Sequence, residues 1–393
     1  MGRAELLQEI RKMRFLEVYE RCRMRRLSYG EAAETLGVSE RTFRRMRGRF
    51  EAEGEEGLLD RRLGKASPHR IGAAEEERVV ALYRERYLGW TVKHFHERAQ
   101  HGHGLQASYG WTKSVLQAAG LVRPAPKRSA HRKKRPRRPL VGMMLHQDGS
   151  RHLWLPALER QIDLIVTMDD ATSEIYAGFF LDEEGTASSF RGLGEVISRH
   201  GLFCALYTDR GSHYFHTPKA GDPVDKGRLT QVGRALAQLG IRHIPAYSPE
   251  ARGRCERVFG TLQDRLVKEL ADAGIATIEA ANRFLAEVYL PMHNRRFAVA
   301  AAEPGSAFVP WTRSDLAEIL CHQEERIVGN DNTVIFGKLR LQIEPSPLRA
   351  HFVKASVQVR RYADDTLAIF YGPRCIGRYR PDGTAMATQS KAA

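Results

Sequence analysis

A basic, proline-rich segment is the feature that most constrains how this sequence can fold. Residues 123–139, RPAPKRSAHRKKRPRRP, contain nine lysines or arginines, four prolines and no acidic residue. Proline keeps the backbone extended and like charges repel, so the segment cannot pack into a core of its own. We interpret it as a linker that follows a phosphate backbone rather than as a solvated hinge, because nine cations exceed what a hinge needs. The cations expected to contact phosphate are Arg132, Lys133, Lys134, Arg135, Arg137 and Arg138.

The two sides of this linker differ in charge. The chain has 393 residues and a formal net charge of +15; residues 1–139 contain 32 Lys+Arg against 17 Asp+Glu, whereas residues 140–393 contain 30 of each. A positive excess confined to the first third predicts contact with a polyanion, first of all nucleic acid. An anionic membrane is the less favoured alternative, because no apolar run approaches the length of a membrane span. Five dispersed cysteines and no signal-peptide pattern fit a reduced cytoplasmic protein.

The first module has the pattern of a helix, a glycine turn and a basic helix. Ser28 and Glu31 have capping-box spacing, Gly37 ends the short helix, and Ser39 caps the helix ERTFRRMRGRF. This is the sequence form of a helix-turn-helix, whose second helix enters the major groove of DNA; an ordinary helical hairpin with a solvated arginine face is the alternative. We assign this domain to residues 1–65. An earlier helix over residues 4–26 has the apolar stripe Leu6, Ile10, Met13 and Leu16, and the expected DNA contacts are Arg41, Thr42, Arg44, Arg45 and Arg49.

A second helical module is predicted over residues 70–122. Thr91 is a possible helix cap and Gly120 a helix stop. A winged-helix-like DNA-binding domain and a purely structural helical domain are almost equally favoured; the first would expose Thr112, Lys113 and Gln117, and we select Lys113 as a DNA contact. The histidines between residues 94 and 103 fit no zinc-binding spacing, so we interpret them as solvated side chains near a helix end.

From Leu140 onward the sequence changes to strand-like runs. LVGMMLHQ, IDLIVTM and EIYAGFFL are typical of three consecutive antiparallel strands, and the buried strand FCALYTD and the short strand IRHI follow between helical stretches. This alternation predicts an α/β domain over residues 140–300. After a proline- and glycine-rich stretch, short alternating runs with glycine turns over residues 320–385 predict a small β-barrel.

Three carboxylates occupy the ends of these elements. Asp148 follows the first apolar run, Asp209 ends FCALYTD, and Glu256 opens the helix after IRHI. Strand and helix ends converge at the carboxyl edge of an α/β sheet, so the three are expected to meet there. A helical projection places Glu256 between Val267 and Leu270, inside the apolar sector, where a carboxylate needs a cation or another partner. On that stretch alone, a salt bridge with a neighbouring arginine explains Glu256 equally well.

Other polar residues near these strands have simpler explanations. Asp169 and Asp170 are more typical of a turn cap than of a metal site, although either is a reserve ligand. His146 shares a strand face with Asp148 and fits a packed or capping histidine better than a metal ligand. Glu184 belongs to a solvated acidic turn with Asp182 and Glu183.

Three sequence blocks carry a family resemblance. HQDGS with Asp148, YTDRGSHY with Asp209 and SPEARGRCER with Glu256 resemble, in order, the signature blocks of the DDE integrase and transposase superfamily, which has a ribonuclease-H-like core. The helix-turn-helix module, HQDGSRHLWL and YLPMHNRRFAV, residues 289–299, further resemble the ISNCY group of bacterial insertion-sequence transposases. The resemblance covers most of the chain. The 46 residues between Asp209 and Glu256 exceed the spacing familiar from retroviral integrases, and Arg210 stands where many relatives have asparagine.

The resemblance implies a Mg²⁺-dependent chemistry on DNA. Asp148 would bridge two Mg²⁺ ions, for which Mn²⁺ can substitute, with Asp209 on one ion and Glu256 on the other. Water would attack at a transposon end, and the freed 3′-hydroxyl would attack target DNA. The implied partners are terminal inverted repeats, target DNA and further copies of the chain in a dimer or higher oligomer, in the bacterial cytoplasm at the nucleoid. The phosphate contacts expected beside the cut are Arg252, Arg254 and Arg257.

Two other functions use part of the same sequence. A catalytically inactive, transposase-derived regulator would need the basic N-terminal third but not the three acids. A nuclease for RNA–DNA hybrids would use the α/β core but leave the helix-turn-helix without a role. The expected architecture is therefore multidomain, with all-α helix-turn-helix modules, a ribonuclease-H-like α/β core and a C-terminal β-barrel.

Overall fold

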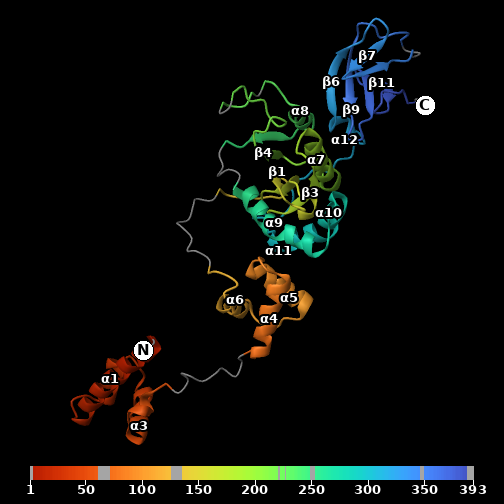
Figure 1. Cartoon of the computed structure of the whole chain (residues 1–393). Coiled ribbons are helices and arrows are strands. Elements are labelled where there is room, and N and C mark those ends of the chain that lie inside the picture. The colour runs from red at the N-terminus through yellow and green to blue at the C-terminus, as the bar shows by residue number, and fades with distance from the viewer. Residues whose placement is uncertain are drawn as a thin grey trace. The chain divides into compact units, whose positions relative to one another are not determined.

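The computed structural model describes residues 3–60, 71–124, 135–219, 222–225, 227–247, 253–345 and 349–386. The chain divides into two compact units, residues 1–82 and residues 83–393. Each unit is described separately, and Figure 1 labels their elements. The helix α4 (Ala73–Arg86) crosses the division.

The first unit is a small helical domain. It contains α1 (Arg3–Arg23), α2 (Tyr29–Thr35), α3 (Glu40–Glu53) and the short helix η1 (Gly54–Leu58). The predicted capping box is confirmed, because Ser28 N donates to Glu31 Oε2 at 2.8 Å and Glu31 N donates to Ser28 Oγ at 3.3 Å. Gly37 ends α2 with a φ of 64°, a left-handed conformation that glycine adopts without strain. Helix, glycine turn and basic helix therefore form as predicted.

The predicted apolar stripe of α1 is wrong. Leu6, Ile10 and Met13 are exposed, whereas Phe15 and Val18 on the other side of α1 are buried. The Phe15 ring lies 5.8 Å from the Phe43 ring, centroid to centroid, in the core shared with α2 and α3. The large aromatic side chain of Phe15 gains more from burial than the smaller aliphatic side chains on the opposite face of α1. The face that bears Phe15 therefore packs against α2 and α3.

The helical part of the second unit comprises the end of α4, α5 (Val92–His103) and α6 (Tyr109–Ala118). The histidine prediction is wrong at two positions, because His94 and His96 are buried. Thr112, expected on the exposed face, is also buried, and its Oγ1 lies 3.0 Å from His96 Nδ1. Burial of His96 and Thr112 is offset by the hydrogen bond between them, and His94 has its partner, Glu269, in a later helix.

A five-stranded mixed sheet forms the centre of the second unit. Its strand order is β3-β2-β1-β4-β5, with antiparallel β1–β2 and β2–β3 pairs and parallel β1–β4 and β4–β5 pairs. The strands are β1 (Leu145–His152), β2 (Ile162–Asp169), β3 (Ile175–Leu181), β4 (Ala205–Thr208) and β5 (Arg242–Pro245). The three predicted antiparallel strands are confirmed, although β1 begins at Leu145 and not at Leu140. Gly142, with a φ of 77°, lies in a turn before it.

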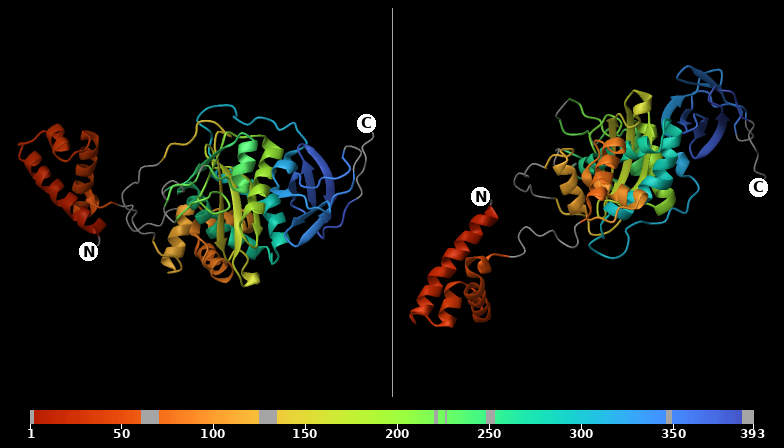
Figure 2. Two further views of the ribbon diagram at one scale, coloured as in Figure 1. Left: turned by 90° about the horizontal axis from the view of Figure 1, so that it is seen from above. Right: turned by 60° about the horizontal axis from the view of Figure 1, so that its bottom comes forward.

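Helices cover both faces of this sheet. One face packs on α7 (Thr186–His200) and α8 (Gln231–Gln238), with Leu145 and Ala177 from the sheet. The other packs on α9 (Gly253–Asp272), α10 (Ile278–Phe284), η4 (Leu285–Tyr289) and α11 (Leu290–Phe297), with Leu164 and Val166. Figure 2 shows these elements from two further directions. Because side chains alternate along a strand, neighbouring residues of β1 face different helices.

The C-terminal region of the second unit is rich in β-structure. After α12 (Leu316–Ile319), the strands β6 (His322–Ile327), β9 (Ser356–Arg361), β10 (Leu367–Tyr371) and β11 (Arg374–Tyr379) form a sheet of order β11-β10-β9-β6. A separate hairpin contains β7 (Thr333–Phe336) and β8 (Leu339–Gln342), and both sheets contribute to one apolar core. The predicted closed β-barrel is not confirmed, because the described strands form two sheets rather than one closed ring.

Candidate active site

The register of two parallel strands brings two of the predicted carboxylates together. Leu145 of β1 lies opposite Leu206 of β4, and His146 lies opposite Tyr207. Continued by two residues, this register places Asp148 opposite Asp209. Both then share the sheet face of His146 and Tyr207, whose ring centroids are 5.1 Å apart. Since neighbouring strands are separated by about 4.8 Å, the backbone positions of the two aspartates are expected to be neighbours at this point of the sheet.

The surroundings of the two aspartates differ. Asp148 is 7% exposed, whereas Asp209, just beyond the end of β4, is half-buried. The amide of Gly211 donates to Asp209 Oδ1 at 2.8 Å, which orients this carboxylate within its own turn. Burial, together with the negative charges of Glu184, Asp148 and Asp209, raises the pKa of Tyr214 well above its ordinary value. The region therefore concentrates negative charge, as a cation site requires.

Glu256 lies in the first turn of α9, and its predicted position in the apolar sector is wrong because the side chain is exposed. The residue still belongs to the flank of α9 that faces β1. Gln263, seven residues later and therefore on nearly the same side of the helix, donates from Nε2 to Ser150 Oγ at 3.1 Å. Ser150 is two residues beyond Asp148 and so lies on the same strand face. Glu256 is thus at the solvent-exposed edge of the face that carries Asp148.

The three carboxylates do not form a closed metal cluster. Within the described ranges, no group of three histidine, cysteine, aspartate or glutamate side chains lies close enough to hold one ion. The donor set itself fits Mg²⁺, which prefers carboxylate oxygens and water. The register thus brings Asp148 and Asp209 to neighbouring positions, and the flank of α9 that bears Glu256 faces the same strand.

Sequence reasoning missed the place of Glu184. This residue was predicted to lie in a solvated turn, but it is half-buried, and its Oε1 lies 3.5 Å from His213 Nε2. A Cβ atom added to Gly149 would lie 2.2 Å from Glu184 Oε2. The glycine beside Asp148 therefore permits this carboxylate to approach the β1 backbone, and the motif Asp-Gly was the available signal.

Several arginines predicted to contact DNA have partners inside the protein. Arg135 and Arg254 both bind the carboxylate of Asp170, and Arg137 NH1 donates to the carbonyl oxygen of Asp170 at 3.0 Å. Burial alone would raise the pKa of Asp170, but hydrogen bonds from His146 and the Arg138 amide and the charge of Arg254 outweigh it and hold that pKa far below its ordinary value. Arg138 and Arg257 are exposed. Arg132, Lys133, Lys134 and Arg252 lie outside the described residues.

The predicted DNA-contacting side chains of the helical modules also divide into two groups. Arg41, Arg44 and Arg45 of α3 and Lys113 of α6 are exposed, and Arg44 pairs with Glu40 in its own helix. Thr42 and Arg49 are instead half-buried: the Thr42 amide and hydroxyl contact the Ser39 hydroxyl, and Arg49 NH2 donates to the Leu59 carbonyl at 3.1 Å. These two side chains therefore stabilise the domain.

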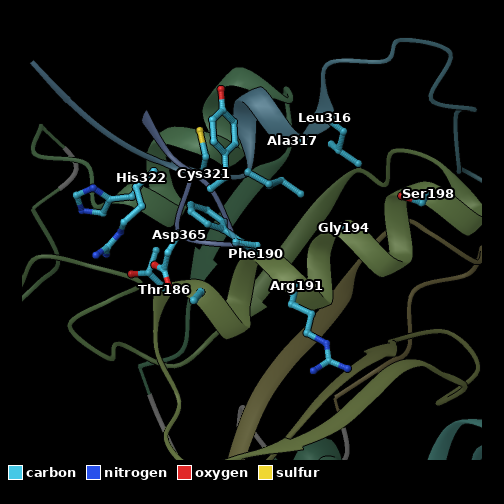
Figure 3. Close-up of a pocket in the computed structure, with 15 residues that line it drawn as sticks. Thr186, Phe190, Arg191, Gly194, Ser198, Leu316, Ala317, Cys321, His322 and Asp365 are labelled. Carbon is cyan, nitrogen blue, oxygen red and sulfur yellow. The ribbon is translucent and has the colours of Figure 1, made fainter. Parts of the chain in front are cut away.

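A cavity of about 610 Å³ lies on the opposite side of the sheet from Asp148. Figure 3 shows Phe190, Gly194 and Ser198 of α7 along one wall and Leu316 of α12 on another. The remaining lining comes from the start of the C-terminal region, including Cys321 and His322, and from the end of β9 and the turn after it, including Arg361 and Asp365. Asp148, Asp209 and Glu256 do not line this cavity, so the candidate active site is a separate place.

Comparison with known proteins gives one family match and two transposase relatives. The family described as winged helix-turn helix matches residues 21–77. The candidate transposase y4bF of Sinorhizobium fredii is 31% identical over 361 residues, 91% of this chain and 78% of its own length. The transposase for insertion sequence IS1202 of Streptococcus pneumoniae is 24% identical over 343 residues, 78% of this chain and 72% of its own length.

Solved structures with similarity to the chain come from retroviruses. A simian T-cell lymphotropic virus intasome in complex with PP2A regulatory subunit B56 gamma has 14% sequence identity and a TM-score of 0.34, and the match covers 77% of this chain and 99% of that one. The HTLV-2 integrase catalytic core domain in complex with magnesium has 17% identity and a TM-score of 0.27, covering 38% and 89%.

A module that matches the winged helix-turn helix family places the chain in the general class of DNA-binding proteins. At the similarity to y4bF given above, the chain belongs to the insertion-sequence transposases, as the DDE-type sequence blocks predicted. Among the helices of the described ranges, none combines the length and apolarity that crossing a bilayer requires.

Proposed function

We propose that this transposase cuts and joins DNA strands at Asp148, Asp209 and Glu256. The observation that carries the proposal is the β1–β4 register, which pairs His146 with Tyr207 and, continued by two residues, brings Asp148 and Asp209 to neighbouring positions on the face covered by α9. Asp148 would bridge two Mg²⁺ ions, Asp209 would bind one and Glu256 the other, with Mn²⁺ able to substitute. Bound there, the ions would activate the attacking hydroxyl and offset charge on the attacking and leaving oxygens.

The protein side chains prepare this site in different ways. Burial of Asp148 limits water around its carboxylate, and the Gly211 amide orients Asp209. Glu256 is exposed on the first turn of α9, so its carboxylate can turn toward β1 when a cation draws it in.

The helical modules and the linker would hold the DNA. The exposed cations of α3, with Lys113 of α6, suit the terminal inverted repeats of the element, whose bases they would read in the major groove. The basic linker and Arg257 suit phosphate contacts beside the cut. Because two transposon ends and a target must be held together, we propose a dimer or higher oligomer on DNA, in the bacterial cytoplasm at the nucleoid.

A DNA-binding regulator without catalytic activity is the second candidate. It is supported by the exposed cations of α3, which sequence-specific binding needs and catalysis does not. It would keep sequence-specific binding through α3 and would not need Asp148, Asp209 or Glu256.

One experiment separates the two functions. The full chain is incubated with Mg²⁺ and a labelled duplex bearing the end of the element, and nicked or joined strands are resolved on a denaturing gel. We expect products from the parent and none from Asp148→Ala or Glu256→Ala, while all three proteins bind the duplex equally. Products that persist in either variant would refute the site, and specific binding without products in the parent would establish the regulator.

A further inference from the structure

Asp170, which directly follows β2, is completely buried yet carries a dense set of polar contacts. Its Oδ1 accepts from Arg135 NH2 at 2.6 Å, lies 2.7 Å from His146 Nε2 and binds Arg254. Its Oδ2 accepts from the Arg138 amide at 2.8 Å. A buried carboxylate needs such partners, because leaving its charge uncompensated costs several kcal/mol.

The turn after β2 does not need Asp170, since its neighbour already performs that role. Asp169 Oδ1 accepts from the amides of Ala171 at 2.8 Å and Thr172 at 2.9 Å. Asp169 Oδ2 accepts from the Gly142 amide at 2.8 Å. The turn cap predicted for the two aspartates is therefore supplied by Asp169 alone, and Asp170 points to other segments of the chain.

The segments that meet at Asp170 lead directly to the candidate active site. His146 is two residues before Asp148 on the same face of β1, and Arg254 is two residues before Glu256 in the first turn of α9. Arg135 and Arg138 belong to the end of the basic linker. Arg254 also donates from NH2 to the Arg135 carbonyl at 2.7 Å, so α9 and the linker are joined to each other as well.

The start of α9 needs an external anchor. Its first residue is Gly253, the residue type with the greatest conformational freedom, and the amides of a first helical turn have no partner within the helix. The Arg254 side chain is 15% exposed and supplies a charge-assisted contact to a carboxylate that burial keeps in one place. The contact fixes the end of α9 that bears Glu256.

We propose that Asp170 is a positioning residue of the transposase, which holds the first turn of α9, and with it Glu256, beside the strand that carries Asp148. The same carboxylate binds Arg135, so the end of the DNA-facing linker is attached at the same point. The proposal rests on the proposed function for the role of Glu256. Its structural part, the anchoring of α9, is independent of catalysis.

The anchoring is tested by hydrogen–deuterium exchange of the full-length protein without metal or DNA. Asp170→Asn removes the charge of the carboxylate. Arg254→Ala removes only the α9 partner of that carboxylate. Because the Arg254 side chain is partly exposed, we expect the core of the protein to stay folded in this variant. Asp182→Asn is the matched control, because Asp182 pairs with Arg160 at 2.6 Å on the exposed surface. We expect exchange over residues 257–262, the first amides of α9 with partners within the helix, to rise at least about tenfold in both test variants and not in the control, with exchange in β1 and β2 unchanged.

The link to Glu256 is tested by the Mg²⁺ concentration that gives half-maximal nicking of the end duplex. We expect this Mg²⁺ concentration to rise about 10- to 100-fold in Asp170→Asn and Arg254→Ala, while the KM for the duplex stays unchanged. In Arg254→Lys, which keeps a cation, the Mg²⁺ concentration should return part of the way to the parent value. Unchanged exchange at the start of α9, or a rise equal throughout the sheet, would overturn the anchoring. A parent protein that never nicks DNA would refute the proposed function and leave the exchange result to decide the role of Asp170.

Discussion

His94 of α5 and Glu269 of α9 form a buried polar pair, with Nε2 and Oε1 2.6 Å apart. His94 is only 3% exposed, and its ring stacks on Trp90 at a centroid distance of 4.0 Å. Arg98 binds Asp272 beside this pair, and Arg265 NH1 binds Glu97 Oε2 at 3.0 Å. The second helical module is therefore attached to the helix of Glu256 by a row of charged contacts.

Replacing His94 with alanine should weaken this attachment. Burial lowers the pKa of His94, so the neutral ring donates its hydrogen bond to the Glu269 carboxylate. Loss of a hydrogen bond to a buried charged group costs about 2 kcal/mol, and chemical denaturation should show this loss in the free energy of unfolding. His101→Ala, at an exposed position of the same helix, is the control and should change stability by less than about 0.5 kcal/mol. Equal effects of the two substitutions would contradict the role given to the pair.

The fold was largely predictable because its signals are local. Apolar runs ended by acids identified β1 to β4, and the capping residues Ser28 and Ser39 identified the helix-turn-helix. The arrangement of the C-terminal strands in two sheets rather than in the predicted barrel was not predictable in the same way. Strand pairing across a barrel depends on contacts between distant residues, which alternation along one strand does not contain.

The sequence predicted that Asp148 and Asp209 lie at one edge of the sheet, but it did not predict what surrounds them. Asp148 and Asp209 end or continue strands whose pairing follows from the α/β pattern. The predicted burial of Glu256 was wrong because a helical projection gives only the direction of each side chain around the helix axis. It does not show which part of the apolar side of the helix the neighbouring strand covers. Two partners of Asp170 are far from it in the sequence: His146 is 24 residues away and Arg254 is 84 residues away. No local sequence pattern could therefore reveal these contacts.

The exposed arginines of α3 should determine how DNA binding depends on salt. Each phosphate contact removed lowers the slope of log K against log salt by about 0.9, because fewer counterions are released. We expect Arg41→Ala and Arg45→Ala each to reduce the slope by roughly this amount for the end duplex, measured by fluorescence anisotropy over a KCl series. A slope that stays at the parent value in both variants would exclude α3 as the binding helix.

Arg49 should behave differently from those two residues. Its guanidinium holds the Leu59 carbonyl and thereby attaches η1 to α3. Arg49→Ala is expected to lower the unfolding free energy of the helix-turn-helix domain by about 1 kcal/mol, the usual contribution of one hydrogen bond, with little change in the salt slope. Chemical denaturation and the same KCl series measure the two quantities, and a reduced slope at full stability would show that Arg49 contacts DNA instead.

Acid should destabilise the second unit through His293. Burial, with the nearby charges of Arg265 and Arg296, lowers the pKa of His293 to about 4. The unfolded state, with a histidine pKa near 6.5, takes up the proton more readily, so stability is present above about pH 6.5 and is lost as the pH falls toward 4. We expect His293 to cost roughly 2 kcal/mol between pH 7 and pH 5. His293→Gln should remove that part of the pH dependence in urea unfolding, and an unchanged dependence would refute it.

Substitution of the paired aspartates should separate DNA binding from chemistry. Asp148→Asn and Asp209→Asn keep side-chain volume and remove one charge from a site where two carboxylates are adjacent, so the protein should remain folded. Nicking of the end duplex should fall by more than about a hundredfold in each, a larger loss than substitutions behind a metal ligand produce. Binding of the duplex by α3 should be unchanged, because neither residue belongs to the helical modules. Isothermal titration calorimetry with Mn²⁺ measures metal binding without DNA. We expect the parent to release heat on binding Mn²⁺ and each variant to release less. An Asp209→Asn protein that retained both Mn²⁺ binding and nicking would mean that the register neighbour of Asp148 is not a ligand.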